Sequence, residues 1–426
     1  MGFQALEKKM IEWRRDFHAY PEIGWGEFLT TAKLIKLLDD MGYELLVGKA
    51  IINEAFVRGR NSKVVEQSFE KAVANGANKE ILDRLEKYTG CVAILDTGKP
   101  GPTTILRFDI DCVNVQETAA PEHVPNQLGF RSKNDGLMHS CGHDGHMAVG
   151  LGLAEWIMQN KEKLNGKIKI IFQPAEEGVR GAAAVVHSGL VDDGDYFISM
   201  HLGIRIKSGE VLLSPTHFLC TTKIDIRFKG KPAHAGIAPQ EGHNALLAAA
   251  HATTQLFGIS RHGGGMTRIN VGVLKAGEGR NVIPCNAELQ LEVRGENSEI
   301  NQYMVDEVMR ITQGVATSYN LEFETEITGE ACDLSNDAEL VDMLREAAKQ
   351  DGLFEKILET RSFNGSEDAT LLAKRVQEKG GKSLYFVLGS DMPGGHHEAN
   401  FDLDEKQFLP GLMLFTRMIE KLNSPQ

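Results

Sequence analysis

The chain lacks any long apolar run. Of its 426 residues, 42% are hydrophobic and 25% are charged. No apolar stretch approaches the roughly 20 residues needed to span a membrane. The N-terminal run MGFQALEKKMIEWRRDFH also has no apolar segment followed by a small-residue cleavage site. These absences argue against a membrane partner and a secretory signal, so we expect a cytoplasmic protein.

Basic residues are also in the minority. There are 46 Lys and Arg residues against 59 Asp and Glu residues, which gives a formal net charge of −13. An acidic surface argues against nucleic acid as a partner, because binding to the phosphate backbone depends on Lys and Arg. The 6 cysteines are scattered without the spacing of a disulfide framework. We therefore expect a reducing compartment.

Helix-like and strand-like segments alternate through the first half of the chain. Three helical patterns come first, at 4–17, 28–41 and 63–88. Strand-like and helix-like patterns then follow in turn, at 91–97, 103–111, 147–160, 167–173, 182–190 and 196–203. This alternation predicts an α/β fold, with a mostly parallel sheet that carries helices on both faces.

The pattern changes after about residue 217. Alternating polar and apolar residues now predict strands, and two helical patterns lie between them. These segments are 221–230, 243–257, 267–277, 287–295, 299–316 and 321–327. They predict a ferredoxin-like α+β layer, with two helices on one face of a four-stranded antiparallel sheet. The first pattern returns near residue 333, so we predict a larger domain over 1–216 and 332–426, interrupted by a smaller one over 217–331.

The run HSCGHDGH at 139–146 carries the strongest chemical signal. Cys141 lies two residues before His143, and a thiolate beside an imidazole can chelate a divalent transition metal. Gly142 between them allows a tight turn of the backbone. The alternative reading is a polar loop that is rich in histidine by chance.

Four further polar clusters fall where the predicted strands end. They are Asp109 and Asp111 in FDID, Glu176 and Glu177 in QPAEEG, His201 in MHLG, and His396 and His397 in GGHHEANFD. Alone, each has an ordinary reading, such as a helix cap, a solvated edge or a satisfied loop histidine. In an open α/β sheet, however, ligands bind at the carboxyl ends of the strands. We therefore expect these clusters to meet.

Together the clusters supply what a two-metal site requires. Such a site needs about five or six ligands of mixed type and one free carboxylate nearby. The candidate ligands are Cys141, His143, Glu177, His201 and one of His396 and His397. Glu176 is then left as the general base, and Asp111 suits a supporting role by accepting the free ring N–H of a ligating histidine. Sulfur, nitrogen and oxygen ligands in one site do not decide between Mn²⁺ and Zn²⁺.

At this point the chain resembles a known family. The motifs, in order, are MHSCGHDGH, IIFQPAEEGVRGA, DYFISMHLG, GKPAHAGIAPQEGHNALLAAA, GRNVIP, GSEDAT and GHHEANFDLDE. They are similar to those of the amidohydrolase branch of the dinuclear aminoacylase/carboxypeptidase-type metallopeptidases. The start WRRDFHAYPEIGWGEF and the helical insertion near 50–88 look most like the p-aminobenzoyl-glutamate hydrolase group of that branch.

The resemblance implies a role for each matched residue. The implied metal ligands are Cys141, His143, Glu177, His201 and His397. His397 is preferred to His396 because the family histidine lies four residues before a Phe, here Phe401. Glu176 matches the general base, and Asp111 matches an aspartate that supports a ligand.

Three further residues match positions in the smaller domain, which the resemblance identifies as a lid and dimerisation domain. His234 matches a histidine that reaches across a dimer interface and polarises the scissile carbonyl. Asn281 and Arg294 match residues that bind the substrate's carbonyl and terminal carboxylate. The alternative readings are a turn residue for Asn281 and a surface strand charge for Arg294.

The implied activity is metal-dependent amide hydrolysis with two divalent ions, Mn²⁺ or Zn²⁺. The expected substrate is p-aminobenzoyl-glutamate or a similar N-acyl or N-aroyl amino acid, cleaved to the free acid and the amino acid. Two alternatives stay open. One is a general N-acyl-amino-acid amidohydrolase; the other is a catalytically quiet metal-binding subunit of a heteromer with a homologous subunit. A homodimer is expected, and the presence of Glu176 argues against the quiet subunit.

Overall fold

The computed structural model describes residues 2–425, which form two compact units. The core unit contains the described residues up to Thr216, then Leu334–Phe363 and the described residues from Asp368 onward. The inserted unit contains His217–Asp333 and Asn364–Glu367. The short segment Asn364–Glu367 thus groups with the inserted unit, whereas the sequence prediction placed it in the larger domain. Within 2–425, none of the helices combines the length and apolar character needed to cross a bilayer.

The core unit contains an eight-stranded sheet in the order β1-β2-β4-β3-β5-β12-β6-β11. Its strands are β1 (Glu44–Val47), β2 (Cys91–Asp96), β3 (Thr103–Asp109), β4 (Lys167–Gln173), β5 (Tyr196–Leu202), β6 (Glu210–Thr216), β11 (Lys356–Ser362) and β12 (Lys382–Leu388). The central strands β4, β3, β5 and β12 are parallel to one another.

The sheet as a whole is mixed, so the expectation of a mostly parallel sheet is met only at its centre. β1 and β2 are antiparallel to each other, β2 is antiparallel to β4, and β6 is antiparallel to β12. The connections explain this. Only residues 97–102 separate β2 from β3, and only 203–209 separate β5 from β6. A parallel crossover needs about a dozen residues, so these short connections reverse the chain.

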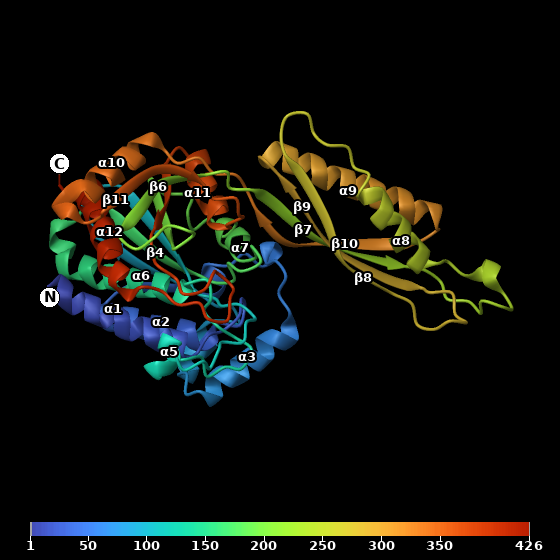
Figure 1. The fold of residues 1–426 in the computed structure, drawn as a ribbon, viewed down its shortest axis with the longest axis horizontal. Coiled ribbons are helices and arrows are strands. Elements are labelled where there is room, and N and C mark those ends of the chain that lie inside the picture. Colours follow the sequence, from blue (N-terminus) through green and yellow to red (C-terminus); the bar gives the residue numbers. More distant parts are fainter. Residues whose placement is uncertain (1, 426) are drawn as a thin grey trace. The chain divides into compact units, whose positions relative to one another are not determined.

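Helices cover both faces of this sheet. They are α1 (Phe3–His18), α2 (Phe28–Met41), α3 (Ser62–Ala74), α4 (Lys79–Arg84), α5 (Val124–Gln127), α6 (His143–Asn160), α7 (Ala182–Val186), α10 (Ala338–Lys349), α11 (Ala369–Glu378) and α12 (Phe408–Asn423). Two successive residues of β3 point to opposite faces. Phe108 packs on Phe415 of α12, whereas Arg107 donates a hydrogen bond to Asp368 at the N-terminus of α11. The parallel strands are therefore buried on both sides, between helices on the two faces of the sheet (Figure 1).

The inserted unit is a four-stranded antiparallel sheet in the order β10-β7-β9-β8 with two helices. Its elements are β7 (Cys220–Lys229), α8 (Ala245–Leu256), β8 (Thr267–Ala276), β9 (Asn286–Gly295), α9 (Ser298–Ser318) and β10 (Glu322–Ala331). Apolar residues of β7 and β9 pack against both helices in one core. The other face of the sheet carries charged pairs such as Arg227 with Glu326. This one-sided burial follows from the alternating sequence of the strands.

Candidate active site

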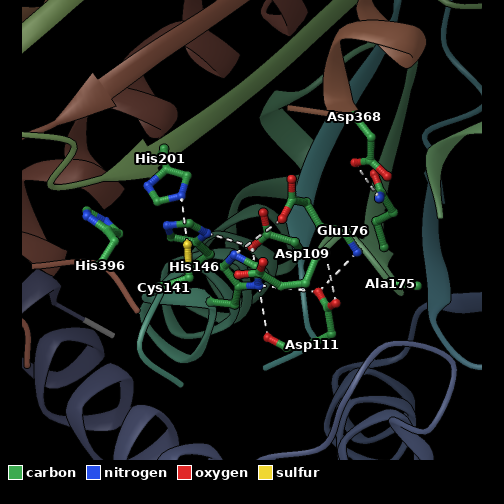
Figure 2. Close-up of polar contacts among 12 residues, drawn as sticks. Asp109, Asp111, Cys141, His146, Ala175, Glu176, His201, Asp368 and His396 are labelled. Atoms are coloured by element: carbon green, nitrogen blue, oxygen red, sulfur yellow. Dashed lines mark hydrogen bonds and ion pairs between the residues drawn. The ribbon is translucent and has the colours of Figure 1, made fainter. Parts of the chain in front are cut away.

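Side chains from five segments of the core unit converge near the carboxyl ends of the parallel strands. The converging side chains are Asp109 and Asp111 at the end of β3, Cys141 and His143 at the start of α6, Glu176 and Glu177 after β4, His201 on β5, and His397 after β12. Three sets of ligand atoms each lie within 4.8 Å of one another: Cys141 with His143 and His201, Cys141 with Glu177 and His397, and His143 with Glu176 and Glu177. The fold thus brings together the residues that the sequence placed far apart (Figure 2).

The turn at the start of α6 directs the side chains of Cys141 and His143 toward the same group of ligand atoms. Gly142 caps this helix with a left-handed backbone, φ 91° and ψ 10°, a conformation that costs glycine nothing. The turn lets the thiol of Cys141 approach Nε2 of His201 to 3.6 Å, while His143 begins the helix. Figure 2 shows the Cys141 and His201 side chains meeting at this point.

The hydrogen bonds of the two imidazoles engage Nδ1 of each ring and leave Nε2 facing the cluster. Nδ1 of His143 lies 2.9 Å from the backbone oxygen of Asp111, so it carries the proton and donates. Nδ1 of His201 donates in the same way to the oxygen of Leu202 at 2.7 Å. Nε2 of His143 is buried and has no hydrogen-bond partner within residues 2–425. Both Nε2 atoms are therefore available as metal ligands.

The two neighbouring histidines after β12 differ in their contacts. The N–H of His397 donates to the backbone oxygen of Ser140 at 2.7 Å, and its Nε2 lies 3.1 Å from Oε1 of Glu177. Nε2 of His396 instead lies 3.3 Å from the oxygen of Leu202. Only His397 of the pair forms a ligand group with Cys141 and Glu177.

Carboxylates from other segments hold the backbone of the loop that carries Glu176 and Glu177. Oδ1 of Asp111 accepts the N–H of Glu176 at 3.1 Å, and Oδ2 accepts the N–H of Glu177 at 2.9 Å. Glu27 accepts the preceding N–H, that of Ala175, at 2.7 Å. These bonds fix the direction of both glutamates, and Asp111 takes up this supporting role as well as facing the ring of His143 at 3.3 Å.

A third buried carboxylate closes the far end of the same loop. Oδ2 of Asp368 accepts the N–H groups of Gly181 at 3.1 Å and Ala182 at 2.9 Å. Within the loop, Ala175 and Val179 adopt positive φ angles of 53° and 58°. Such angles are costly for residues with a Cβ, especially for a β-branched one. The carboxylates that hold the backbone at both ends offset this strain.

The electrostatics of the cluster favour positive charge. Burial lowers the pKa of His143, but the carboxylates of Asp109 and Asp111 outweigh this effect and raise the pKa to about 10. Without a cation in the cluster Nε2 of His143 therefore carries a proton, which a bound metal ion would displace. Burial and the carboxylate of Glu177 raise the pKa of Cys141, so a cation is needed to keep this thiol ionised. Sulfur, nitrogen and carboxylate donors with stabilised positive charge fit divalent metal ions.

Two other histidines of the HSCGHDGH run have different positions. Nδ1 of His146 lies 2.6 Å from Asp109, and its Nε2 accepts the N–H of Leu202 at 3.0 Å. Both ring nitrogens are therefore used, and His146 links the ends of β3 and β5. His139 is buried, and burial lowers its pKa to about 3, so its ring stays neutral.

The remaining predicted residues lie in the inserted unit. The N–H of Ala235 bonds to the oxygen of Asn281 at 3.0 Å, which holds His234 beside Asn281. Nδ1 of His234 accepts the N–H of Gly236 at 3.1 Å, so Nε2 carries the proton. Arg294 forms an ion pair with Glu292 at 3.0 Å.

The structure does not bring Arg294 close to His234 and Asn281 within one chain. Arg294 lies near the end of β9, eight residues beyond Asn286 where that strand begins. At about 3.3 Å per residue this separation is about 26 Å. Asn281 precedes the start of the strand, so it lies at the opposite end of β9 from Arg294.

Known proteins match the chain along nearly its whole length. The model described as "Peptidase family M20/M25/M40" matches residues 105–421. A protein of Haemophilus influenzae, named as a homologue of p-aminobenzoyl-glutamate hydrolase, is 58% identical over 417 residues, which is 98% of this chain and 99% of that protein. The "Indole-3-acetyl-aspartic acid hydrolase" of Enterobacter agglomerans is 42% identical over 425 residues, 99% of this chain and 97% of that protein.

A solved structure agrees. The aminobenzoyl-glutamate utilization protein from Klebsiella pneumoniae superposes with a TM-score of 0.85 at 38% identity, and the match covers 98% of this chain and 97% of that one. The family resemblance inferred from the motifs is therefore confirmed, and the protein is a hydrolytic enzyme. The chain belongs to peptidase family M20/M25/M40.

Proposed function

We propose that the protein is a metal-dependent amidohydrolase that cleaves the amide of p-aminobenzoyl-glutamate or of a similar N-acyl or N-aroyl amino acid. The observation that carries this proposal is the adjacent pair Glu176 and Glu177. Glu177 contacts His397 at 3.1 Å and shares a ligand group with Cys141. Glu176 lies 3.9 Å from His143 and belongs to neither of the two groups that contain Cys141. One carboxylate can thus ligate while its neighbour handles protons.

The residues proposed to hold two divalent ions, Mn²⁺ or Zn²⁺, are Cys141, His143, Glu177, His201 and His397. When bound there, such ions supply Lewis-acid polarisation of a carbonyl and lower the pKa of water. Asp111 fixes the ring of His143 through its backbone oxygen and holds the amides of both glutamates. It therefore sets the direction of a ligand and of the base at once.

Glu176 is the proposed general base. Its side chain is nearly buried, with 9% of the residue exposed, so little bulk water competes for its proton. In the proposed reaction its carboxylate takes a proton from the water that attacks the amide carbonyl. The protonated carboxyl then gives this proton to the leaving nitrogen, which completes the hydrolysis. The products are p-aminobenzoate and glutamate.

His234 is proposed to donate a hydrogen bond to the scissile carbonyl oxygen. Its tautomer supports this role, since Nδ1 accepts a backbone N–H and Nε2 carries the proton. Asn281 beside it is a proposed substrate contact, and so is Arg294. Because Arg294 lies at the other end of β9, the proposal takes His234 and Asn281 from one copy of the chain and Arg294 from another. A homodimer, or a heteromer with a homologous subunit, and a cytoplasmic location remain part of the proposal.

The test begins with metal-stripped protein to which Mn²⁺ or Zn²⁺ is returned. Release of p-aminobenzoate is followed from p-aminobenzoyl-glutamate, beside a panel of N-acetyl amino acids. We expect metal-dependent release that Glu176→Gln abolishes while bound metal, measured by elemental analysis, stays unchanged. Faster turnover of the N-acetyl panel would favour the general amidohydrolase. Bound metal without turnover of any substrate would contradict the proposal and favour the quiet subunit.

A further inference from the structure

Arg180 lies on the same loop as the two glutamates and has no part in the proposed mechanism. Its Nε donates a hydrogen bond to the backbone oxygen of Glu177 at 2.7 Å. Its own N–H donates to the oxygen of Ala175 at 3.1 Å, which closes the loop beneath it. The guanidinium is therefore fixed against the main chain that carries Glu177.

The outer edge of this guanidinium is unpaired. Within residues 2–425, neither Nη1 nor Nη2 of Arg180 forms a hydrogen bond or an ion pair. Neighbouring carboxylates are engaged elsewhere, because Glu177 contacts His397 and Asp111 accepts two backbone N–H groups. Arg180 is half-buried rather than free in solvent. A half-buried cation without a counterion on the loop of the base is a site for an anion.

Gly24 makes room for this edge. A Cβ at position 24 would lie 2.4 Å from Nη2 of Arg180 and 2.9 Å from Cα of Ala175. The residue before it, Ile23, forms a parallel bridge with Cys112. Cys112 directly follows Asp111, which holds the two glutamates. A side chain at position 24 would therefore displace the guanidinium from its present place against the loop.

We propose that Arg180 binds the side-chain carboxylate of the substrate's amino-acid part, so that the enzyme selects N-acyl conjugates of glutamate or aspartate over neutral ones. With Nε anchored, Nη1 and Nη2 present two parallel N–H donors, which match a carboxylate in bidentate geometry. Arg294 is the residue that the resemblance matches to the substrate's terminal carboxylate, so the second carboxylate of a glutamate or aspartate conjugate still needs a partner. This inference rests on the proposed amidohydrolase function and deepens it.

The test compares p-aminobenzoyl-glutamate with p-aminobenzoyl-glutamine, which has the same shape but a neutral side chain. Steady-state kinetics are measured on the full-length metal-loaded enzyme and on Arg180→Met and Arg180→Lys. Arg361→Met is the matched control, because it removes one positive charge from an exposed arginine of β11. Binding of both ligands is also measured by calorimetry in the Glu176→Gln background, where turnover does not interfere.

The kcat/KM of the wild type should be about 10- to 100-fold higher for the glutamate conjugate, because the glutamine conjugate has no charged side chain to pair with Arg180. Arg180→Met should raise KM and Kd for the glutamate conjugate by a similar factor, and change the values for glutamine by less than about threefold. Arg180→Lys should recover part of the loss, and Arg361→Met should change nothing.

Three results would overturn the inference. The first is equal turnover of both conjugates by the wild type, which would leave the amidohydrolase proposal standing. The second is a loss in Arg180→Met that is the same for both conjugates, as a merely structural role would give. The third is a Kd for the glutamate conjugate that Arg180→Met leaves unchanged. Failure of the wild type to cleave either conjugate, with calorimetry showing the preference for glutamate, would instead count against the proposed function alone.

Discussion

Replacing Asp368 by asparagine tests the idea that buried carboxylates hold the loop 175–182, which carries Glu176 and Glu177. Asp368 is fully buried, and the donors to its two oxygens include the following four. Oδ1 accepts Nη2 of Arg107 at 3.1 Å and Nε2 of Gln173 at 2.9 Å. Oδ2 accepts the N–H groups of Gly181 and Ala182. In the Asp368→Asn variant one of these oxygens becomes an NH₂ group, so two buried donors lose their acceptor and face another donor.

The cost follows from the two orphaned donors. Each buried donor left without a partner costs about 1–3 kcal/mol, so we expect the free energy of unfolding to fall by about 3 kcal/mol. With an unfolding entropy of about 2.1 cal/mol/K per residue, this loss lowers Tm of the 426-residue chain by about 3 to 4 °C. The steric change is small, because asparagine has nearly the shape of aspartate.

The measurement is thermal unfolding of metal-stripped protein by differential scanning calorimetry. Asp192→Asn is the matched control. Asp192 pairs with Arg375 at 2.7 Å on the surface, with about a third of its side chain exposed. A surface pair contributes at most about 1 kcal/mol, so this variant should melt within about 1 °C of the wild type. If Asp368→Asn melts together with Asp192→Asn, the carboxylate does not hold the loop as argued.

Two further predictions concern pH and oxidation. Burial raises the pKa of Glu22 from 4.5 to about 7, so the folded chain binds more protons than the unfolded chain between these values. The free energy of unfolding should therefore fall as pH rises through this window, by up to about 3 kcal/mol. Urea unfolding at pH 5 and pH 8 should show a smaller fall in Glu22→Gln, and an equal fall in both proteins would contradict this assignment. Hydrogen peroxide should inactivate the metal-free enzyme faster than the metal-loaded one, because a free Cys141 is open to oxidation and a ligating one is shielded. Activity after metal is restored measures this, and equal rates would count against Cys141 as a ligand.

The proposed ligand residues could be picked out from the sequence because each lies in a short motif at a strand end or, for Cys141 and His143, at a helix start. Cys141 and His143 share one turn, and His201 is on a strand that reads clearly from its pattern. The choice of His397 over His396 came from the resemblance alone. In the structure the difference lies in the backbone, where the N–H of His397 bonds to Ser140. No local pattern encodes that bond.

The supports of the loop were not predicted. Asp368 lies in the motif GSEDAT and Glu27 in the N-terminal segment, and nothing local shows that both accept backbone N–H groups of residues 175–182. Arg180 also went unassigned, although the run EEGVRGA places it beside the glutamates. The feature that could have pointed to Arg180 is a single basic residue close in sequence to two glutamates.

The mixed strand directions of the core sheet could be predicted in part from the sequence. The short connections 97–102 and 203–209 exclude a helical crossover, and this constraint could have predicted antiparallel partners. β11 could not be found by pattern, because its sequence KILETRS lies at the sheet edge and is largely exposed. An edge strand of this kind has no buried face to impose alternation.

The loop 175–182 is held in shape largely by side chains from other segments. Its amides at Ala175, Glu176, Glu177 and Gly181 are all bonded to carboxylates from other segments. The main-chain path is thus held at both ends by carboxylates of other segments, and Nε of Arg180 adds one bond from within. An engineered change at position 180 therefore removes one bond to the loop and leaves the carboxylate supports in place.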